Sequence, residues 1–125
     1  MPTKNSKKLL IVEDERSIAK ALQLKLTIAG FEVDTAGNGE EALALMKTKK
    51  FDLLLLDIMM PKMDGFSVMA EMKKNKNKTP IIILSNLSQE EDAKRAEELG
   101  AVDFFIKSNT PLAEIVDKVK KFLKV

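Results

Sequence analysis

The 125-residue sequence contains neither cysteine nor histidine. Without cysteine, disulfide bonds and thiolate chemistry are excluded, which fits a cytoplasmic protein. Without histidine, neither a Ser–His nor a Cys–His nucleophile pair can form, and any metal ion would have to be held by oxygen ligands. Two common kinds of nucleophilic catalysis and zinc sites built from nitrogen and sulfur are therefore excluded.

Long apolar stretches and a strong net charge are also missing. No run reaches the roughly 18 consecutive apolar residues of a membrane-spanning helix, and the polar start Met1–Lys8 does not resemble a signal peptide. The net charge is only +2 and the lysines are spread along the chain, so the lysine-rich stretch Lys73–Lys78 is expected to be a solvated loop. We expect no direct binding to nucleic acid and none to membranes.

Short apolar runs alternate five times with longer amphipathic segments. The runs are Lys8–Val12, Phe31–Thr35, Phe51–Leu56, Pro80–Leu84 and Val102–Ile106. The third and fourth are continuously apolar, as in strands of a parallel sheet that is buried on both faces. The length suits one core. The pattern predicts a single α/β domain over residues 1–125, a doubly wound (βα)5 three-layer sandwich with a five-stranded parallel sheet, in which residues 1–6 form a flexible tail.

The amphipathic segments predict five helices. The first three cover about Glu15–Ala29, Glu40–Lys49 and Gly65–Lys74. Leu22–Ile28 alternates like a strand, but the length of its segment and the stop at Gly30 favour a helix. The fourth helix opens with the capping box Ser88–Glu91 and closes at Leu99 and Gly100, and the fifth has Thr110 as its N-cap and Pro111 at its first position. The apolar stripe of the fifth is Leu112, Ile115, Val116, Val119, Phe122 and Leu123.

Polar side chains that could act together follow four of the predicted strands. They are Glu13, Asp14 and Glu15 after the first strand, Asp57 after the third, Ser85 and Asn86 after the fourth, and Lys107 after the fifth. The carboxyl ends of parallel strands meet at one edge of a sheet, so these groups are expected to converge. Grouped carboxylates repel one another unless a cation binds, and this set of oxygen ligands suits Mg²⁺, or Mn²⁺ in its place.

Such a group of side chains has the chemistry of a phosphoryl-transfer site. A dication, the Lys107 ammonium and the Ser85 hydroxyl would neutralise the charge of a phosphoryl group, and Asp57 would accept it as an acyl phosphate. Each acid alone has an ordinary explanation as a helix N-cap or a solvated charge, and for Glu15 we prefer that explanation. The joint occurrence at four strand ends favours the phosphoryl site.

Four segments resemble the receiver domains of two-component response regulators, of the chemotaxis-regulator type. They are Leu10–Glu15, Asp57–Gly65, Ile83–Ser85 and Asp103–Lys107. The second is the most specific, because Pro61 and Gly65 stand at the family's spacing from the aspartate. The resemblance covers Lys7 to Leu123. It implies a flavodoxin-like fold and a phosphorylation-activated signalling switch. Such a switch is not an enzyme, and it catalyses only its own phosphoryl transfer and dephosphorylation.

The resemblance also implies roles for the matching side chains. Asp57 resembles the phospho-acceptor, and Lys107 the lysine that pairs with the phosphoryl oxygens. Ser85 resembles the hydroxyl residue that moves onto the phosphoryl group. Phe104 matches the aromatic switch that turns inward when the hydroxyl moves, and a plain core aromatic is an equal alternative.

A metal site is implied in the same way, together with two departures from the family. Asp14 resembles a direct ligand, Glu13 a ligand acting mainly through water, and the backbone carbonyl of Met59 a third protein ligand beside Asp57. Ser108 stands where the family usually has a proline after a cis bond. Because a cis bond before serine costs about 3 kcal/mol, we expect a trans Lys107–Ser108 bond. Asn86 replaces a small residue and could partly obstruct access to Asp57.

The resemblance implies a histidine kinase or a histidine phosphotransfer protein as the donor, and an effector whose identity the sequence does not contain. In this family the first helix meets the helical bundle of the donor, so Ile18 and Leu24 are candidates for donor docking. If Ile18, Leu22 and Leu26 face the core, Leu24 and Ile28 are left partly exposed. We expect a monomer or a weak dimer that depends on phosphorylation. The sequence is compatible with a stand-alone regulator and with part of a longer one.

Two other function classes compete with the switch. A small metal-dependent phosphatase could use the same charges, but phosphohydrolases of similar topology carry an Asp-x-Asp pattern after the first strand, where this chain has Glu13–Glu15 and no lid insertion. A flavin- or nucleotide-binding module would need a glycine-rich phosphate loop, and neither G-x-G-x-x-G nor a Walker pattern occurs.

Overall fold

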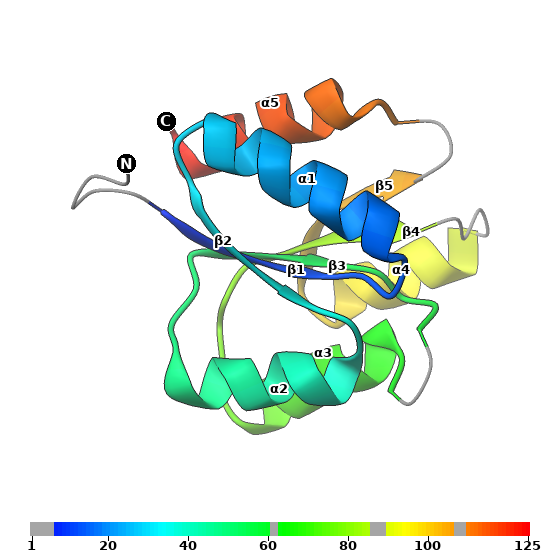
Figure 1. Cartoon of the computed structure of the whole chain (residues 1–125). Coiled ribbons are helices and arrows are strands. Elements are labelled where there is room, and N and C mark those ends of the chain that lie inside the picture. The colour runs from blue at the N-terminus through cyan, green and yellow to red at the C-terminus, as the bar shows by residue number, and fades with distance from the viewer. Residues whose placement is uncertain (1–6, 61–62, 86–89, 107–109) are drawn as a thin grey trace.

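The computed structural model describes residues 7–60, 63–85, 90–106 and 110–125. Strands and helices alternate along these residues (Figure 1). The strands are β1 (Lys8–Val12), β2 (Glu32–Ala36), β3 (Leu53–Leu56), β4 (Ile81–Ser85) and β5 (Ala101–Ile106). The helices are α1 (Arg16–Ile28), α2 (Gly39–Thr48), α3 (Gly65–Lys74), α4 (Glu90–Glu98) and α5 (Leu112–Leu123).

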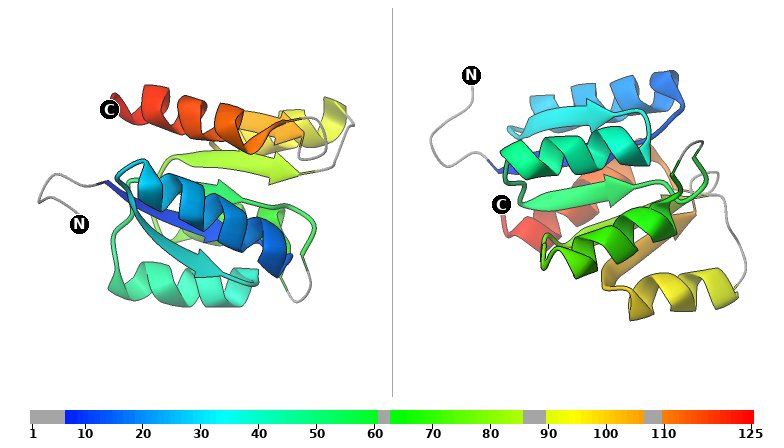
Figure 2. Two further views of the ribbon diagram at one scale, coloured as in Figure 1. Left: turned by 45° about the horizontal axis from the view of Figure 1, so that its top comes forward. Right: turned by 90° about the horizontal axis from the view of Figure 1, so that it is seen from below.

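All neighbouring strands are parallel, in the order β2-β1-β3-β4-β5. Helices α1 and α5 cover one face of the sheet, and α2, α3 and α4 cover the other (Figures 1 and 2). The predicted doubly wound (βα)5 sandwich is confirmed. The order reverses at β1, whose two neighbours are β2 and β3, so the carboxyl end of β1 is where a ligand is expected in such a sheet.

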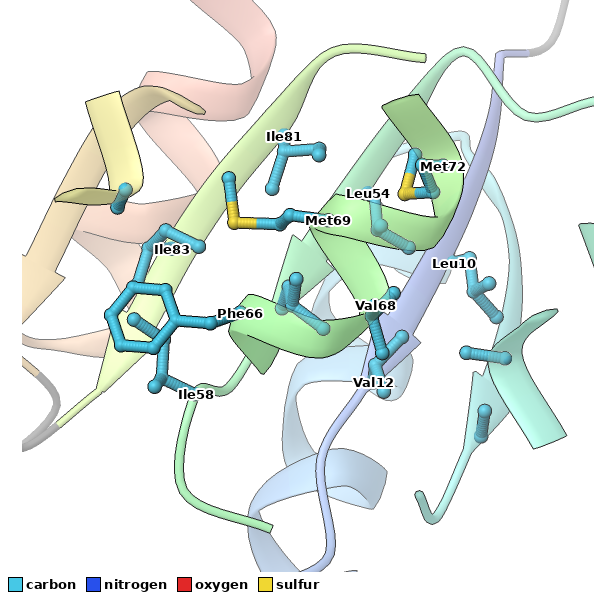
Figure 3. Close-up of a cluster of buried hydrophobic side chains, with 14 residues drawn as sticks. Leu10, Val12, Leu54, Ile58, Phe66, Val68, Met69, Met72, Ile81 and Ile83 are labelled. Carbon is cyan, nitrogen blue, oxygen red and sulfur yellow. The ribbon is translucent and has the colours of Figure 1, made fainter. Parts of the chain in front are cut away.

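The apolar strands divide their side chains between two cores. On β1, Leu9 and Ile11 join the cluster beneath α1 and α5, while Leu10 and Val12 join the cluster beneath α2, α3 and α4 (Figure 3). Residues of β3 and β4 alternate in the same way. Because both faces are covered, each central strand must be apolar at every position, which explains the continuous runs seen in the sequence.

Two predicted glycine stops are confirmed at the ends of α1 and α4. Gly30 and Gly100 have φ values of +104° and +107°, a left-handed conformation that glycine adopts without steric penalty. Helix α3 ends without a glycine. Lys76 takes the left-handed position there with a φ of 59°.

Several details of the sequence prediction were wrong. Thr110 is not the N-cap of α5, because Pro111 has extended backbone angles and is itself the N-cap, so the helix starts at Leu112. Phe122 does not complete the buried stripe, since 40% of its surface remains exposed near the end of α5. Most of the other boundaries move by one or two residues. The capping-box residue Ser88 and the expected tail at residues 1–6 lie outside the described residues.

Helices α3 and α4 are joined on the outside of the sheet by an Arg–aromatic contact. The guanidinium carbon of Arg95 lies 4.2 Å from the centroid of the Phe66 ring. Contacts of this kind contribute about 0.5–1 kcal/mol at exposed sites.

No helix in the described part of the chain is long and apolar enough to cross a membrane.

Candidate functional site

The strand register places Glu13 and Asp57 side by side. Val12 pairs with Leu56, so the residues that follow them leave the sheet at the same level. Two backbone hydrogen bonds continue the sheet past the strand ends. The Asp57 N–H donates to the Val12 carbonyl at 2.9 Å, and the Glu13 N–H donates to the Ala36 carbonyl at 3.0 Å. Both acids are therefore held by the sheet itself rather than by a loose loop.

The structure brings three acidic side chains together at this edge. Carboxylate oxygens of Glu13, Asp14 and Asp57 all lie within 4.8 Å of one another. Glu13 and Asp57 are each only 4% exposed, while Asp14 is open to solvent. Backbone N–H groups bind the two buried acids: Glu15 donates to Glu13 Oε2 at 3.0 Å, and Met59 donates to Asp57 Oδ1 at 3.2 Å.

This donor set fits a hard divalent cation. All three side chains offer carboxylate oxygens, one of them from the solvent side, and Mg²⁺ binds through one or two carboxylates while keeping several waters. Two carboxylates taken out of water at short range repel each other, and that repulsion is strongest where the dielectric constant is low. A bound cation would relieve the repulsion, so the geometry suits Mg²⁺ or Mn²⁺.

Gly65 at the start of α3 packs against the backbone of Asp57. A Cβ atom added at Gly65 would lie 2.6 Å from the Asp57 carbonyl oxygen and 2.7 Å from the Ile58 Cα. The Gly65 N–H donates to the Ile58 carbonyl at 2.8 Å. The glycine that the resemblance singled out by spacing thus has a physical role, since only a residue without a side chain lets α3 approach the acceptor strand this closely.

Ser85 and Phe104 occupy the positions predicted from β4 and β5. Ser85 is fully buried as the last residue of β4 and pairs in register with Ile106. Phe104 is half-buried and packs against the core beneath α2, α3 and α4. Its N–H donates to Asp103 Oδ1 at 2.8 Å. This position agrees with a core aromatic and leaves the switch role as a prediction.

Some predicted residues lie outside the described part of the chain. They are Lys107, Ser108, Asn86 and Pro61. The expectation of a trans Lys107–Ser108 bond and that of a partial obstruction by Asn86 therefore stay predictions. Lys107 directly follows Ile106, the last residue of β5.

Two basic residues beside the acids were missed by the sequence analysis. Arg16 and Lys20, one turn apart on α1, line a hollow of about 290 Å³ together with Glu13 and Glu41. Their spacing of four residues directly after the acidic strand end was the available signal, because residues four apart share one face of a helix. The edge of the site next to α1 is therefore of mixed charge.

The side of α1 that faces away from the sheet is apolar in two places. Leu24 is 62% exposed and Ile28 is 77% exposed, as expected from the burial of Leu22 and Leu26. Ile18 is half-buried and packs against the core beneath α1 and α5. Of the two docking candidates, Leu24 is thus the more accessible.

Comparison with known proteins agrees with this geometry. The family model of the response regulator receiver domain matches residues 9–120. A probable transcriptional regulator, ycf27, of Cyanidium caldarium is 45% identical over 116 residues, which make up 93% of this chain and 46% of that protein. The alkaline phosphatase synthesis transcriptional regulatory protein PhoP of Bacillus subtilis is 41% identical over 119 residues, or 95% of this chain and 49% of that protein. The chain spans about half the length of these curated relatives.

Solved structures extend the likeness to the whole fold. The receiver domain of the Francisella response regulator 1452 superposes with a TM-score of 0.89 at 31% identity, covering 95% of this chain and 98% of that one. The response regulator TrrA of Thermotoga maritima, in complex with Mg²⁺ and BeF, superposes with a TM-score of 0.79 at 37% identity, covering 92% and 97%. These regulators lend no support to the phosphatase alternative. The chain belongs to the response regulator receiver domain family of two-component systems.

Proposed function

We propose that this chain works by accepting a phosphoryl group on Asp57. The observation that carries the proposal is the gathering of Glu13, Asp14 and Asp57 at the carboxyl edge of the sheet, with two of the three acids buried. An Asp57 carboxylate oxygen attacks the phosphorus and forms an O–P bond. The P–N bond to the donor's imidazole breaks, and its electron pair returns to the ring nitrogen. Later attack by water on the phosphorus releases inorganic phosphate and restores the carboxylate.

The other residues of the edge bind and orient the reacting groups. Asp14 and Asp57 would hold Mg²⁺ directly, the Met59 backbone carbonyl would add a ligand, and Glu13 would act through water. The bound ion supplies positive charge that neutralises the phosphoryl oxygens. The Met59 N–H holds one oxygen of Asp57.

Lys107 and Ser85 would bind the transferred phosphoryl group. In our proposal the Lys107 ammonium pairs with its oxygens. The Ser85 hydroxyl moves onto the phosphoryl group and Phe104 turns inward, which shifts the balance between two conformations of the partner-binding face.

The partners follow from this chemistry. We propose a histidine kinase or a histidine phosphotransfer protein as the donor, because the chain has no histidine of its own. We propose that residues 1–125 act as one receiver domain in the cytoplasm and signal to a separate effector or output segment. The related transcriptional regulators are about twice as long, which makes control of an output segment one form that the signal could take.

The proposal is tested by intact-mass measurement after incubation with Mg²⁺ and acetyl phosphate. The wild type should gain one phosphoryl group, and omission of the metal should prevent the gain. Asp57→Asn should gain none, while Asp52→Asn, which changes an aspartate at the opposite edge of the sheet, should behave as the wild type. Equal phosphate incorporation by Asp57→Asn would refute the assignment.

A further inference from the structure

A second hollow lies at the opposite edge of the sheet from the acids. It has a volume of about 420 Å³ and lies between the last turn of α3, the loop from α3 to β4, and the start of β5. Figure 3 shows Met69 and Met72 on α3, with Ile81 at the start of β4 nearby. These three residues line the hollow but are almost fully buried, and Leu99 and Val102 line it as well. Val102, which also borders a neighbouring hollow, is 48% exposed.

Lysines rim this apolar groove. Lys73, Lys76 and Lys78 line it, and none of its lining residues is acidic. Within the described part of the chain, none of the three ammonium groups makes an ion pair or a hydrogen bond. The sequence alone suggested a solvated loop over Lys73–Lys78, which is wrong for Lys73 and Lys74, because they form the end of α3. The structure adds that the same lysines surround exposed apolar surface, so the groove complements a ligand that is apolar at one end and anionic at the other.

The loop that carries the rim is fixed by its own hydrogen bonds. Asn77 Oδ1 accepts from the Thr79 N–H at 3.1 Å and from the Thr79 hydroxyl at 2.6 Å. The Asn77 N–H donates to the Met72 carbonyl at 2.8 Å. A loop ordered in advance loses little conformational entropy when a ligand binds.

Lys76 stands where helices usually place a glycine. Its φ of 59° is left-handed, and its N–H donates to the Lys73 carbonyl at 3.1 Å, which closes the helix end. A side chain in this conformation costs about 1–2 kcal/mol relative to the right-handed form. The position therefore places a charged side chain on the groove rim at the expense of stability.

We propose that the groove binds a small amphipathic anion, with a short aliphatic chain in the apolar trough and a carboxylate or similar head group between the lysines. Pockets of about 300–1,000 Å³ take small molecules, and the volume of this hollow lies within that range. The site is separate from the acidic edge, because β4 starts at the groove and ends at Ser85, about 13 Å further along. A ligand bound here would contact both α3 and the junction between α4 and β5. It would therefore link α3 and β5, the two elements whose other ends lie near the phosphoryl site.

Sodium octanoate is the probe, and methyl signals of the methionines report its position. In protein labelled at the methionine methyl groups, octanoate should shift Met69 and Met72 saturably and leave Met59, at the acidic edge, unchanged. Acetate has the charge without the chain and should give no shift. 1-Octanol has the chain without the charge and should bind roughly two- to fivefold more weakly, as expected for the loss of a surface ion pair.

Matched variants separate the groove from general hydrophobic association. Val102→Asp should abolish the shifts, while Ile28→Asp, at an exposed apolar residue on α1, should leave them intact. Lys73→Gln should weaken octanoate binding severalfold, and Lys74→Gln, whose side chain does not line the groove, should not. The proposal is overturned if shifts fail to saturate, if octanol binds as well as octanoate, or if Val102→Asp binds normally. Binding of an acidic amphipathic peptide without binding of octanoate would also overturn it.

Discussion

At the scale of single residues, the buried acids are positioned by neighbours that have no reactive side chain. Gly65 brings α3 against the Asp57 carbonyl, and the backbone N–H of Met59 binds the Asp57 carboxylate. The chain order of the strands predicted that the acids would meet. It did not predict that Glu13 would be buried and Asp14 exposed, because that depends on how the backbone turns after β1.

We predict that Gly65→Ala destabilises the protein and disturbs the acidic site. The new methyl group would lie 2.6 Å from a backbone oxygen that cannot move alone, so the loss should be about 1–3 kcal/mol, as for overpacked cores. Denaturant unfolding measures it. Gly37→Ala is the control, because its Cβ would meet only the flexible Glu41 side chain at 3.7 Å. Equal stability of the two variants would contradict the close-approach argument.

We predict that Asp14→Asn stabilises the metal-free protein while weakening its response to Mg²⁺. Removing one charge from three carboxylates within 4.8 Å relieves repulsion worth about 0.5 kcal/mol at an exposed position. A cation that binds only the folded state stabilises it by mass action, so the variant should lose part of that gain. Thermal melts with and without Mg²⁺ measure both effects. Asp117→Asn, at an exposed position of α5, should alter neither the stability nor the response to Mg²⁺. If Asp14→Asn responds fully to Mg²⁺, Asp14 does not contribute to the metal site.

At the scale of helices and strands, the sequence predicted whether a segment is a helix or a strand better than it predicted the residues at which each element ends. Continuous apolar runs identified β3 and β4 because both faces of the sheet are covered. Gly30 and Gly100 marked two helix ends through their positive φ values. The end of α3 carried no such glycine, and Pro111 proved to be the N-cap rather than the first helical residue. Caps depend on one residue's ψ angle, which apolar periodicity does not encode.

We predict that Lys76→Gly raises the free energy of unfolding by about 1 kcal/mol, because glycine removes the penalty of a left-handed side chain. Lys74→Gly, inside the last turn of α3, should instead lose roughly 0.5 kcal/mol, because glycine disfavours the helix. Urea titration of both variants gives the two signs. Destabilisation by both would mean that Lys76 makes contacts that offset its conformation.

At the scale of the whole molecule, the small net charge of +2 conceals a separation of charge. Acids gather at the carboxyl edge of the sheet, with Arg16 and Lys20 beside them, and lysines without acidic neighbours line the groove at the opposite edge. Composition could not predict this, since it depends on which strand ends face which way. The topology did predict the acidic edge, because parallel strands direct all their carboxyl ends to one side. It gave no hint of the groove, which arises from side-chain packing between α3 and β5.

A third surface, the exposed apolar part of α1, should decide which donors the protein can use. Leu24 is 62% exposed on α1, the helix that begins beside Glu13 and Asp14. We therefore expect a protein that delivers a phosphoryl group to Asp57 to contact Leu24. We predict that Leu24→Ala slows phosphoryl transfer from a histidine donor severalfold and leaves the rate with acetyl phosphate unchanged, since the small donor needs no docking surface. Rapid-quench measurement of phosphorylated protein with each donor gives the two rates. Val125→Ala, at an equally exposed apolar residue outside α1, should affect neither rate. Slowing with both donors would instead show that Leu24→Ala disturbs the acidic edge through α1, because acetyl phosphate shares only that edge with the protein donor.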